Sequence, residues 1–207
     1  MRKIVSLVLS FVMIFALAAC GQSAASEKQE TELPESVTTE EQEADVSTKT
    51  LVVYFSCTGT TKLVAEYVTE ILGADIYEIV PEDPYTEADL AYYTNGRADQ
   101  EQNDPDVRPA ISGGVGNMDE YDTIIIGYPI WHGQAPRIIS TFLESYDFSG
   151  KTIIPFCTSH SSGIGSSASN LHTLCSDSAV WMEGKRFESG VSEESVQEWI
   201  GYIYSGI

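Results

Sequence analysis

The chain has 207 residues, of which 43% are hydrophobic and 10% aromatic, so it can bury the core of one globular domain. Its 31 acidic and 11 basic residues give a formal net charge of −20 at pH 7, which disfavours nucleic acid and anionic lipid surfaces as direct partners because both carry negative charge. Four scattered cysteines are too few for a disulfide-built scaffold and include no CxxC metal pair.

The first 19 residues have the pattern of an export signal. A positively charged start precedes residues 4–19, which are uncharged, nearly all apolar and short for a membrane-spanning helix. Small residues at the end of this run precede Cys20, and the junction resembles the lipobox of bacterial lipoproteins. The resemblance implies that residues 1–19 are a signal peptide and that lipidated Cys20 anchors the exported protein to the outer face of the cell membrane. An ordinary signal peptide with a chance cysteine, or an uncleaved anchor, is the alternative.

Residues 20–49 are predicted to be an acidic flexible linker. Residues 21–49 contain eight acidic residues, two basic residues and no aromatic residue, so they cannot bury enough surface to offset chain entropy. Their net charge of −6 and the +2 of residues 1–20 leave −16 for residues 50–207. Mutual repulsion keeps such a linker extended, and we expect it to hold the domain at 50–207 away from the membrane.

The remaining residues alternate predicted strands and helices. A continuous apolar run over 50–55 predicts a strand that is buried on both faces, and apolar residues at helical spacing predict a helix over 61–73. Further strands are predicted at 75–80, 122–127, 151–157 and within 178–187. Further helices are predicted at 136–146, 164–175 and 192–204. This alternation predicts an α/β fold with an open parallel sheet of five strands and helices on both faces.

Residues 81–121 interrupt the alternation. A short helix is predicted over 86–93, and a long segment rich in Asn, Asp, Pro and Gly follows it. A loop of this length in a compact domain is either functional or a lid.

Three loops that follow predicted strands carry the candidate binding residues, because ligands of open parallel sheets bind beyond the carboxyl ends of the strands. The first loop, Ser56-Cys57-Thr58-Gly59-Thr60-Thr61, places hydroxyl groups, a glycine and free backbone N–H groups at a helix N-terminus. Together these groups can bind a phosphate dianion. The loop matches neither GxxxxGK[ST] nor GxGxxG, which disfavours ATP or NAD sites of those kinds. A hydroxyl-rich helix cap without a ligand is the alternative.

The second loop, Pro129-Ile130-Trp131-His132-Gly133, is an aromatic turn at the expected sheet edge. A flat ring stacked on Trp131 would explain this turn, and packing of Trp131 on neighbouring helices is the alternative. His132 is a candidate general acid or ring-edge donor, although a lone histidine is more often a plain hydrogen-bonding residue. The third loop can bind the edge of a heteroaromatic ring through backbone N–H groups of Thr158, Ser159, His160, Ser161 and Gly163.

The three loops together resemble those of the flavodoxin family. The pattern Ser56-x-Thr58-Gly59-x-Thr61 matches the family's loop for the phosphate of FMN, with Thr60 where Asn is common. The resemblance covers residues 50–207 and implies a three-layer fold with strand order 2-1-3-4-5. It also implies non-covalent FMN held by the three loops. Many flavodoxins cover the outer ring face with a third-loop tyrosine, whereas this chain has His160, so we expect Trp131 to be the main stacking partner.

The resemblance implies an electron carrier. The acidic domain is expected to meet redox proteins with basic surfaces, and to contact the membrane only through its lipid anchor. An open flavin face also suits a quinone or NAD(P)H, so an FMN-dependent NAD(P)H:quinone-type oxidoreductase is one alternative. A surface binding module that keeps the fold without flavin is another.

Overall fold

The computed structural model describes residues 49–205. The predicted signal peptide, Cys20 and the linker up to residue 48 lie outside the described residues. Within residues 49–205, no helix is both long enough and apolar enough to span a membrane.

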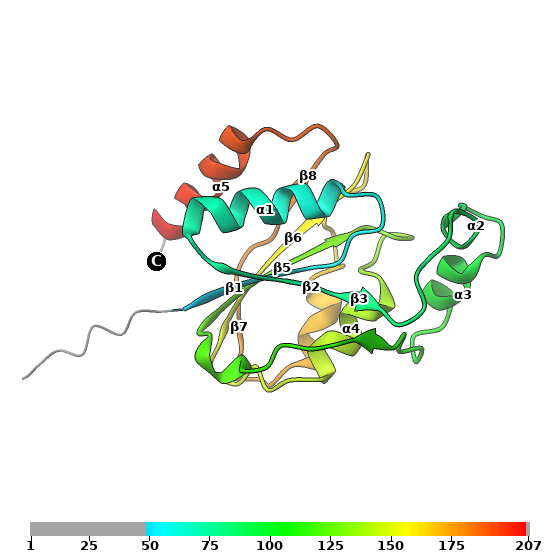
Figure 1. Ribbon diagram of the computed structural model, residues 1–207, viewed down its shortest axis with the longest axis horizontal. Coiled ribbons are helices and arrows are strands. Elements are labelled where there is room, and N and C mark those ends of the chain that lie inside the picture. Colours follow the sequence, from blue (N-terminus) through cyan, green and yellow to red (C-terminus); the bar gives the residue numbers. More distant parts are fainter. Residues whose placement is uncertain (1–48, 206–207) are drawn as a thin grey trace, which may run out of the picture. The chain divides into compact units, whose positions relative to one another are not determined.

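A parallel sheet forms the centre of the domain (Figure 1). In spatial order its strands are β2 (Asp75–Glu78), β1 (Thr50–Tyr54), β5 (Thr123–Pro129), β6 (Thr152–Thr158) and β7 (Val180–Trp181), and β8 (Lys185–Phe187) also pairs with β6. The predicted α/β fold and strand order are therefore confirmed, with the fifth strand divided in two. All pairs within this sheet are parallel, so the carboxyl ends of β1, β5 and β6 meet at one edge.

Helices cover both faces of the sheet. Helices α1 (Thr60–Leu72) and α5 (Glu193–Ser205) lie on one face, and α4 (Arg137–Glu144) with the 3-10 helix η2 (Ser169–Leu174) lies on the other (Figure 1). Because side chains alternate along a strand, Val52 and Tyr54 pack under α1 and α5, whereas Leu51 and Val53 pack in the α4 core. Both faces of β1 are buried, as its unbroken apolar sequence predicts.

The division between β7 and β8 follows from Pro155. The carbonyl of Ile153 accepts a hydrogen bond from Met182 N at 2.9 Å, so alternate residues of β6 direct their backbone groups toward this edge. Pro155 occupies the next such position and has no N–H to donate. Pairing resumes at Lys185, opposite Phe156.

The helix predicted over 164–175 is wrong. Only η2 forms there, and turns precede it. Gly165 adopts a φ of +50°, and the hydroxyls of Ser167 and Ser169 donate to the carbonyls of Ile164 and Ser166. Such local side-chain bonds compete with the α-helix.

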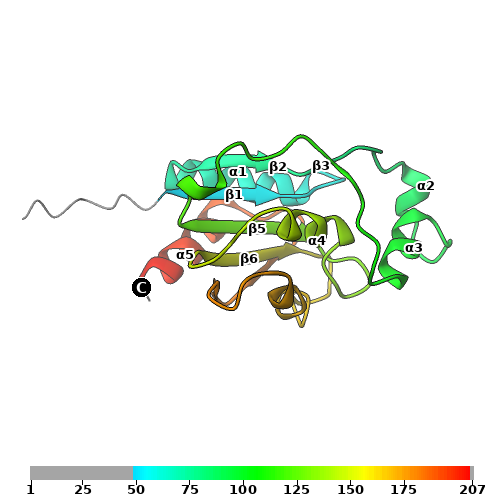
Figure 2. The same ribbon diagram turned by 90° about the horizontal axis from the view of Figure 1, so that it is seen from below.

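The segment 82–110, called the insert below, projects from the sheet. Strands β3 (Val80–Pro81) and β4 (Ile111–Ser112) pair at its base, and the 3-10 helix η1 (Met118–Glu120) follows. The insert contains α2 (Glu87–Leu90), which is shorter than the helix predicted over 86–93, and α3 (Arg97–Asn103), which the sequence pattern does not predict. Gly96 allows these helices to approach, since a Cβ there would lie 2.7 Å from the carbonyl oxygen of Ala88. Figure 2 shows both helices beyond the ends of the sheet strands.

Candidate functional site

The first loop joins β1 to α1 at the carboxyl edge of the sheet. Ser56 Oγ accepts a hydrogen bond from Gly59 N at 3.1 Å, and Gly59 adopts a φ of +87°, which glycine reaches without steric cost. Helix α1 begins with no side-chain cap and no acidic residue in its first turn. Its first backbone N–H groups and the positive end of its dipole are therefore available to an anion.

A buried hydroxyl pair ties the first loop to the third. Thr61 Oγ1 lies 2.7 Å from Thr158 Oγ1, at the end of β6, and either hydroxyl can be the donor. Thr61 and Thr158 are 1% and 4% exposed. This bond holds the start of α1 against the end of β6.

The second loop is a two-residue hairpin. The backbone N–H groups of Trp131 and Gln134 each donate to the other residue's carbonyl at 2.9 Å. His132 and Gly133 have φ values of +49° and +76°, as in a type I′ turn. A positive φ is uncommon outside glycine, although histidine adopts it more readily than most residues, and contacts outside the turn stabilise it here.

Helix α3 of the insert provides these contacts. Gln102 Nε2 donates to the carbonyls of Trp131 at 2.9 Å and of Ala135 at 3.2 Å. Asp99 Oδ1 lies 2.7 Å from His132 Nε2, and Asp99 is 6% exposed. Burial acts to raise the pKa of Asp99, but hydrogen bonds from His132 and from backbone N–H groups hold that pKa below its usual value. Asp99 is therefore a carboxylate at neutral pH.

Aromatic rings surround the hairpin. Phe55 and Tyr85 meet the Trp131 ring edge to face, with centroids 5.5 and 5.1 Å away. Tyr92 stacks on the His132 ring at 4.7 Å, with 5° between the ring planes. The aromatic neighbours of Trp131 therefore lie after β1 and before α2 rather than on helices, and stacking of a flat ring on Trp131 stays a prediction.

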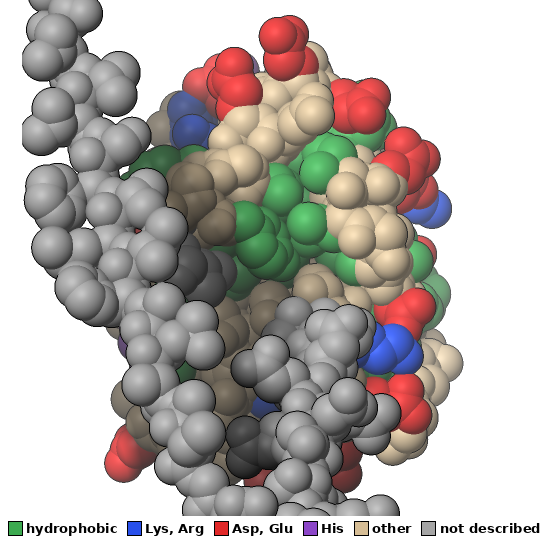
Figure 3. All heavy atoms as spheres, turned by 90° about the vertical axis from the view of Figure 1, so that its left-hand side faces the viewer, with side chains coloured by type: hydrophobic (Ala, Val, Ile, Leu, Met, Phe, Trp, Pro, Cys, Tyr) green, Lys and Arg blue, Asp and Glu red, His purple; other side chains and the backbone are tan. Residues whose placement is uncertain are grey.

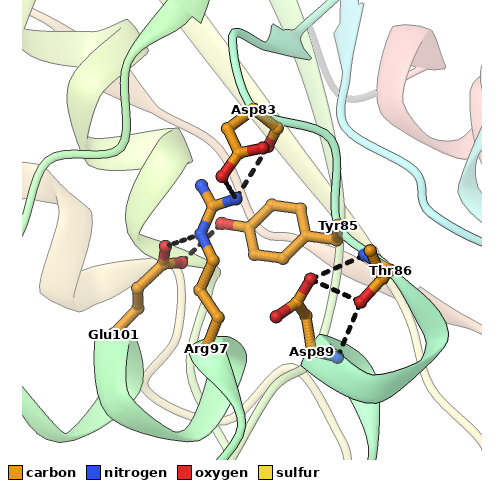
Figure 4. A network of polar contacts seen from close by, with 6 residues as sticks. All are labelled: Asp83, Tyr85, Thr86, Asp89, Arg97 and Glu101. Atoms are coloured by element: carbon orange, nitrogen blue, oxygen red, sulfur yellow. Dashed lines mark hydrogen bonds and ion pairs between the residues drawn. The ribbon is translucent and has the colours of Figure 1, made fainter.

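A charged network anchors Tyr85 to α3 (Figure 4). Arg97 Nε donates to Glu101 at 2.7 Å, and Nη1 donates to the Asp83 carbonyl at 2.7 Å. The Tyr85 hydroxyl donates to the other carboxylate oxygen of Glu101, and the Arg97 guanidinium lies 4.3 Å from the centre of the Tyr85 ring. The network therefore sets the position of Tyr85, one of the two rings against Trp131.

These elements enclose a cavity of about 170 Å³ at the carboxyl edge of the sheet. The first loop, the second loop and the insert all contribute side chains. The lining residues are Ser56, Cys57, Thr58, Thr61, Leu90, Tyr92, Ala98, Asp99, Pro129, Trp131 and His132. Sequence reasoning selected the members from the two loops and missed the four from the insert. The available signal was a pair of adjacent tyrosines, Tyr92 and Tyr93, within an otherwise polar segment.

The other predicted site residues lie around this cavity but do not line it. Gly59 precedes α1, Thr60 is its first residue, and Ile130 and Gly133 belong to the second loop. The third loop, from Thr158 through Ser159, His160 and Ser161 to Gly163, lies beside β8. There Ser159 N donates to the Phe187 carbonyl at 3.1 Å, and Ser159 Oγ accepts from the backbone of Ser161 and Ser162.

The fold and the site define an open α/β protein with a ligand cavity at the carboxyl edge of its sheet. A family model described as flavodoxin matches residues 49–203, and the chain therefore belongs to the flavodoxin family. This confirms the resemblance seen in the three loops. No curated protein matches the chain.

Solved structures agree with this family. A flavoprotein from Bacteroides uniformis is 46% identical, with a TM-score of 0.71 over 74% of this chain and 98% of its own. A flavoprotein from Bacteroides eggerthii is 43% identical, with a TM-score of 0.70 over 75% of this chain and 98% of its own. A flavoprotein from Lactobacillus acidophilus, solved in complex with FMN, is 27% identical, with a TM-score of 0.55 over 74% of this chain and 99% of its own.

Replacement of Arg97 tests the buried network. Arg97→Met should lower the free energy of unfolding by about 3 kcal/mol, because the Glu101 side chain is only 9% exposed and would lose its cation. Arg108→Met is a matched control, since Arg108 also lies 2.7 Å from a glutamate, but that side chain, on Glu144, is 40% exposed. The control should cost less than about 1 kcal/mol. Urea denaturation measures both, and equal losses would contradict the assigned importance of burial.

Proposed function

We propose that this chain is an FMN-binding electron-transfer protein held on the outer face of the cell membrane by lipidated Cys20. The observation that carries the cofactor is the meeting, at one cavity, of an uncapped helix N-terminus, several hydroxyl groups and a tryptophan turn. Family membership and the FMN complex of the Lactobacillus acidophilus relative support the same cofactor.

The first loop fits the phosphate of FMN. Ser56, Thr58 and Thr61 line the cavity beside the first turn of α1, and the Thr61 hydroxyl is bonded to Thr158. A Cβ at Gly59 would meet nothing within 4 Å, so no side chain fills the bend of the loop. Hydroxyl and backbone N–H donors can bind a dianion without lysine or arginine. Neither lysine nor arginine occurs among the residues that line the cavity.

The second loop fits the flavin ring. Trp131 lines the cavity, and its edge-to-face contacts with Phe55 and Tyr85 fix the plane of its indole. A planar ring can stack in an offset manner on such a fixed surface. Tyr92 of the insert adds a second ring to the cavity wall, which the third loop does not supply.

FMN, when bound, supplies reversible uptake of electrons at its ring. The chain binds the phosphate, orients the ring against Trp131 and surrounds both with negative charge. Residues 50–207 carry a net charge of −16, which disfavours further negative charge on the bound ring. We therefore infer a low reduction potential for the bound cofactor.

The charge of the domain also indicates the partner. Acidic side chains outnumber basic ones in the domain as a whole, and this excess is visible even at the end where β1 begins, opposite the cavity (Figure 3). An acidic surface attracts redox proteins with basic surfaces and gives association rates that fall with ionic strength. We infer that such proteins deliver and remove the electrons.

The first-loop hydroxyls can be tested by FMN titration of the full-length protein in detergent. Thr58→Ala should weaken FMN binding about ten- to a hundredfold, because a hydrogen bond to a charged group contributes about 1.5–3 kcal/mol. Riboflavin lacks the phosphate and should bind the wild type and the variant equally. Thr173→Ala, at an exposed threonine of η2, is the control. A wild-type protein that is colourless after unbound FMN has been removed would support the flavin-free binding module.

Carrier and reductase differ in their use of NAD(P)H. The FMN-loaded protein alone should oxidise NAD(P)H slowly, with or without a quinone, because we infer that its electrons come from a protein partner. Steady-state absorbance of NAD(P)H measures this rate, and free FMN at the same concentration is the control. Rapid turnover that saturates with NAD(P)H would instead support the oxidoreductase.

The lipid anchor can be tested in cells that are fed labelled palmitate. The wild-type protein should be labelled and found with the membranes, because acyl chains supply the membrane affinity. Cys20→Ser should lose the label and leave the membrane fraction, whereas Cys57→Ser should keep both properties. An unlabelled wild-type protein would support an ordinary signal peptide.

A further inference from the structure

Thr158 lies where the three loops meet. It is the last residue of β6 and pairs with Pro129 of β5 and Phe187 of β8. Its carbonyl accepts a hydrogen bond from Ile130 N, in the second loop, at 3.0 Å. Its hydroxyl lies 2.7 Å from that of Thr61, in the first turn of α1. The sheet therefore fixes the place of Thr158, and its side chain contacts the loop that we assign to a phosphate.

The two hydroxyls differ in what lies beside them. Thr61 lines the cavity, whereas Thr158 is not among its lining residues. Both residues are buried, with 1% and 4% of their surface exposed. Within residues 49–205, each hydroxyl has the other as its sole hydrogen-bond partner. Each carries one proton, and the bond between them uses only one of the two, so the other proton needs a further acceptor.

Burial distinguishes the two possible directions of this bond. If Thr61 donated to Thr158, the Thr158 proton would be buried without an acceptor, which is unfavourable. If Thr158 donates to Thr61, the free proton belongs to Thr61, beside the cavity, where a bound ligand or water can accept it. The second arrangement leaves no buried donor unpaired, and it directs the Thr61 proton to the cavity.

The first loop makes an anion the preferred acceptor of this proton. Helix α1 has no side-chain cap and no acidic residue in its first turn, so its N–H groups and dipole favour negative charge at the same place. Asp99, the carboxylate in the cavity wall, already accepts hydrogen bonds from His132 and from Asn95 N. A hydroxyl that accepts a hydrogen bond also donates more strongly, because the two bonds polarise each other.

We propose that Thr158 is a positioning residue for the phosphate of FMN. Its hydroxyl donates to Thr61 Oγ1, and Thr61 in turn donates to the phosphate in the first loop. The side chain of Thr158 thus acts on the phosphate from the third loop. The sequence had suggested a different role, in which the backbone N–H of Thr158 binds the ring edge. The role proposed for the side chain rests on the proposed FMN-binding function.

The test compares FMN with riboflavin, which lacks the phosphate, in titrations of the full-length protein in detergent. Thr158→Val keeps the shape of the side chain and removes the hydroxyl. The ratio of the riboflavin Kd to the FMN Kd should fall about three- to tenfold, the usual contribution of a hydrogen bond between neutral groups. Thr158→Ser keeps the hydroxyl and should keep the ratio. A general loss of packing would weaken the binding of both flavins equally and leave the ratio unchanged.

A double substitution tests whether Thr158 acts through Thr61. Thr61→Val removes the direct donor and should lower the same ratio about ten- to a hundredfold. In that background Thr158→Val should lower it no further, because the hydroxyl that Thr158 orients is gone. Thr141→Val is the matched control, since the Thr141 hydroxyl, in α4, is buried without a hydrogen-bond partner among the described residues. Its ratio should equal that of the wild type.

NMR of the FMN-loaded wild type gives a second measurement. The hydroxyl proton of Thr61 should show a scalar coupling to the phosphorus of bound FMN, because such a coupling passes through a hydrogen bond between them. This measurement decides if Thr158→Val does not fold. A Thr61 hydroxyl proton that is coupled to no phosphorus would overturn the role of Thr158.

The result for Thr158→Val separates this role from the proposed function. An unchanged or higher ratio, with FMN bound, would overturn the role of Thr158 and leave the FMN site standing. A further fall of the ratio in the Thr61→Val background would also overturn it, because Thr158 would then act by another route. A wild type that binds no FMN would overturn both proposals.

Discussion

The contact between α3 and the hairpin at 131–134 determines the candidate site. Gln102 holds the hairpin by its carbonyl groups, and Asp99 holds the ring of His132. These bonds stabilise a positive φ that is uncommon outside glycine. Arg97 and Glu101 of the same helix hold Asp83 and Tyr85, so α3 also positions an aromatic neighbour of Trp131. The cavity therefore depends on a segment that lies outside the sheet and its covering helices.

The cavity offers donors to an anion without any lysine or arginine in its lining, although the domain is strongly acidic. A domain of −16 that binds a nucleotide could line its cavity with lysine and arginine, but it uses backbone N–H groups, hydroxyls and a helix dipole. In the proposed site these donors bind the phosphate while leaving the surface acidic. Because the phosphate needs no lysine or arginine, the domain can keep an acidic surface that selects basic partners.

Much of the fold could be predicted because its cause is local. The apolar run of β1 and the helical spacing of α1 are visible in short windows, and alternation of such windows is sufficient for a parallel sheet. Two predictions failed, one because of a strand-to-strand contact and one because of local bonds that propensity does not reveal. Pro155 divides the last strand by withholding one hydrogen bond from its neighbour. Local serine bonds and Gly165 prevent the helix expected over 164–175.

The residues of the candidate site also fall into those that local sequence patterns identify and those that only the fold brings together. The first and second loops could be selected from the sequence, because hydroxyls before a helix and a Trp-His-Gly turn after a strand are local patterns. That Asp99 and Tyr92 join them is visible only in the folded domain. Asp99 lies 33 residues from His132, and no periodicity links two such positions. Their pairing exists because the insert folds back over the end of the sheet, where Gln102 and Arg137 form hydrogen bonds between α3 and distant segments.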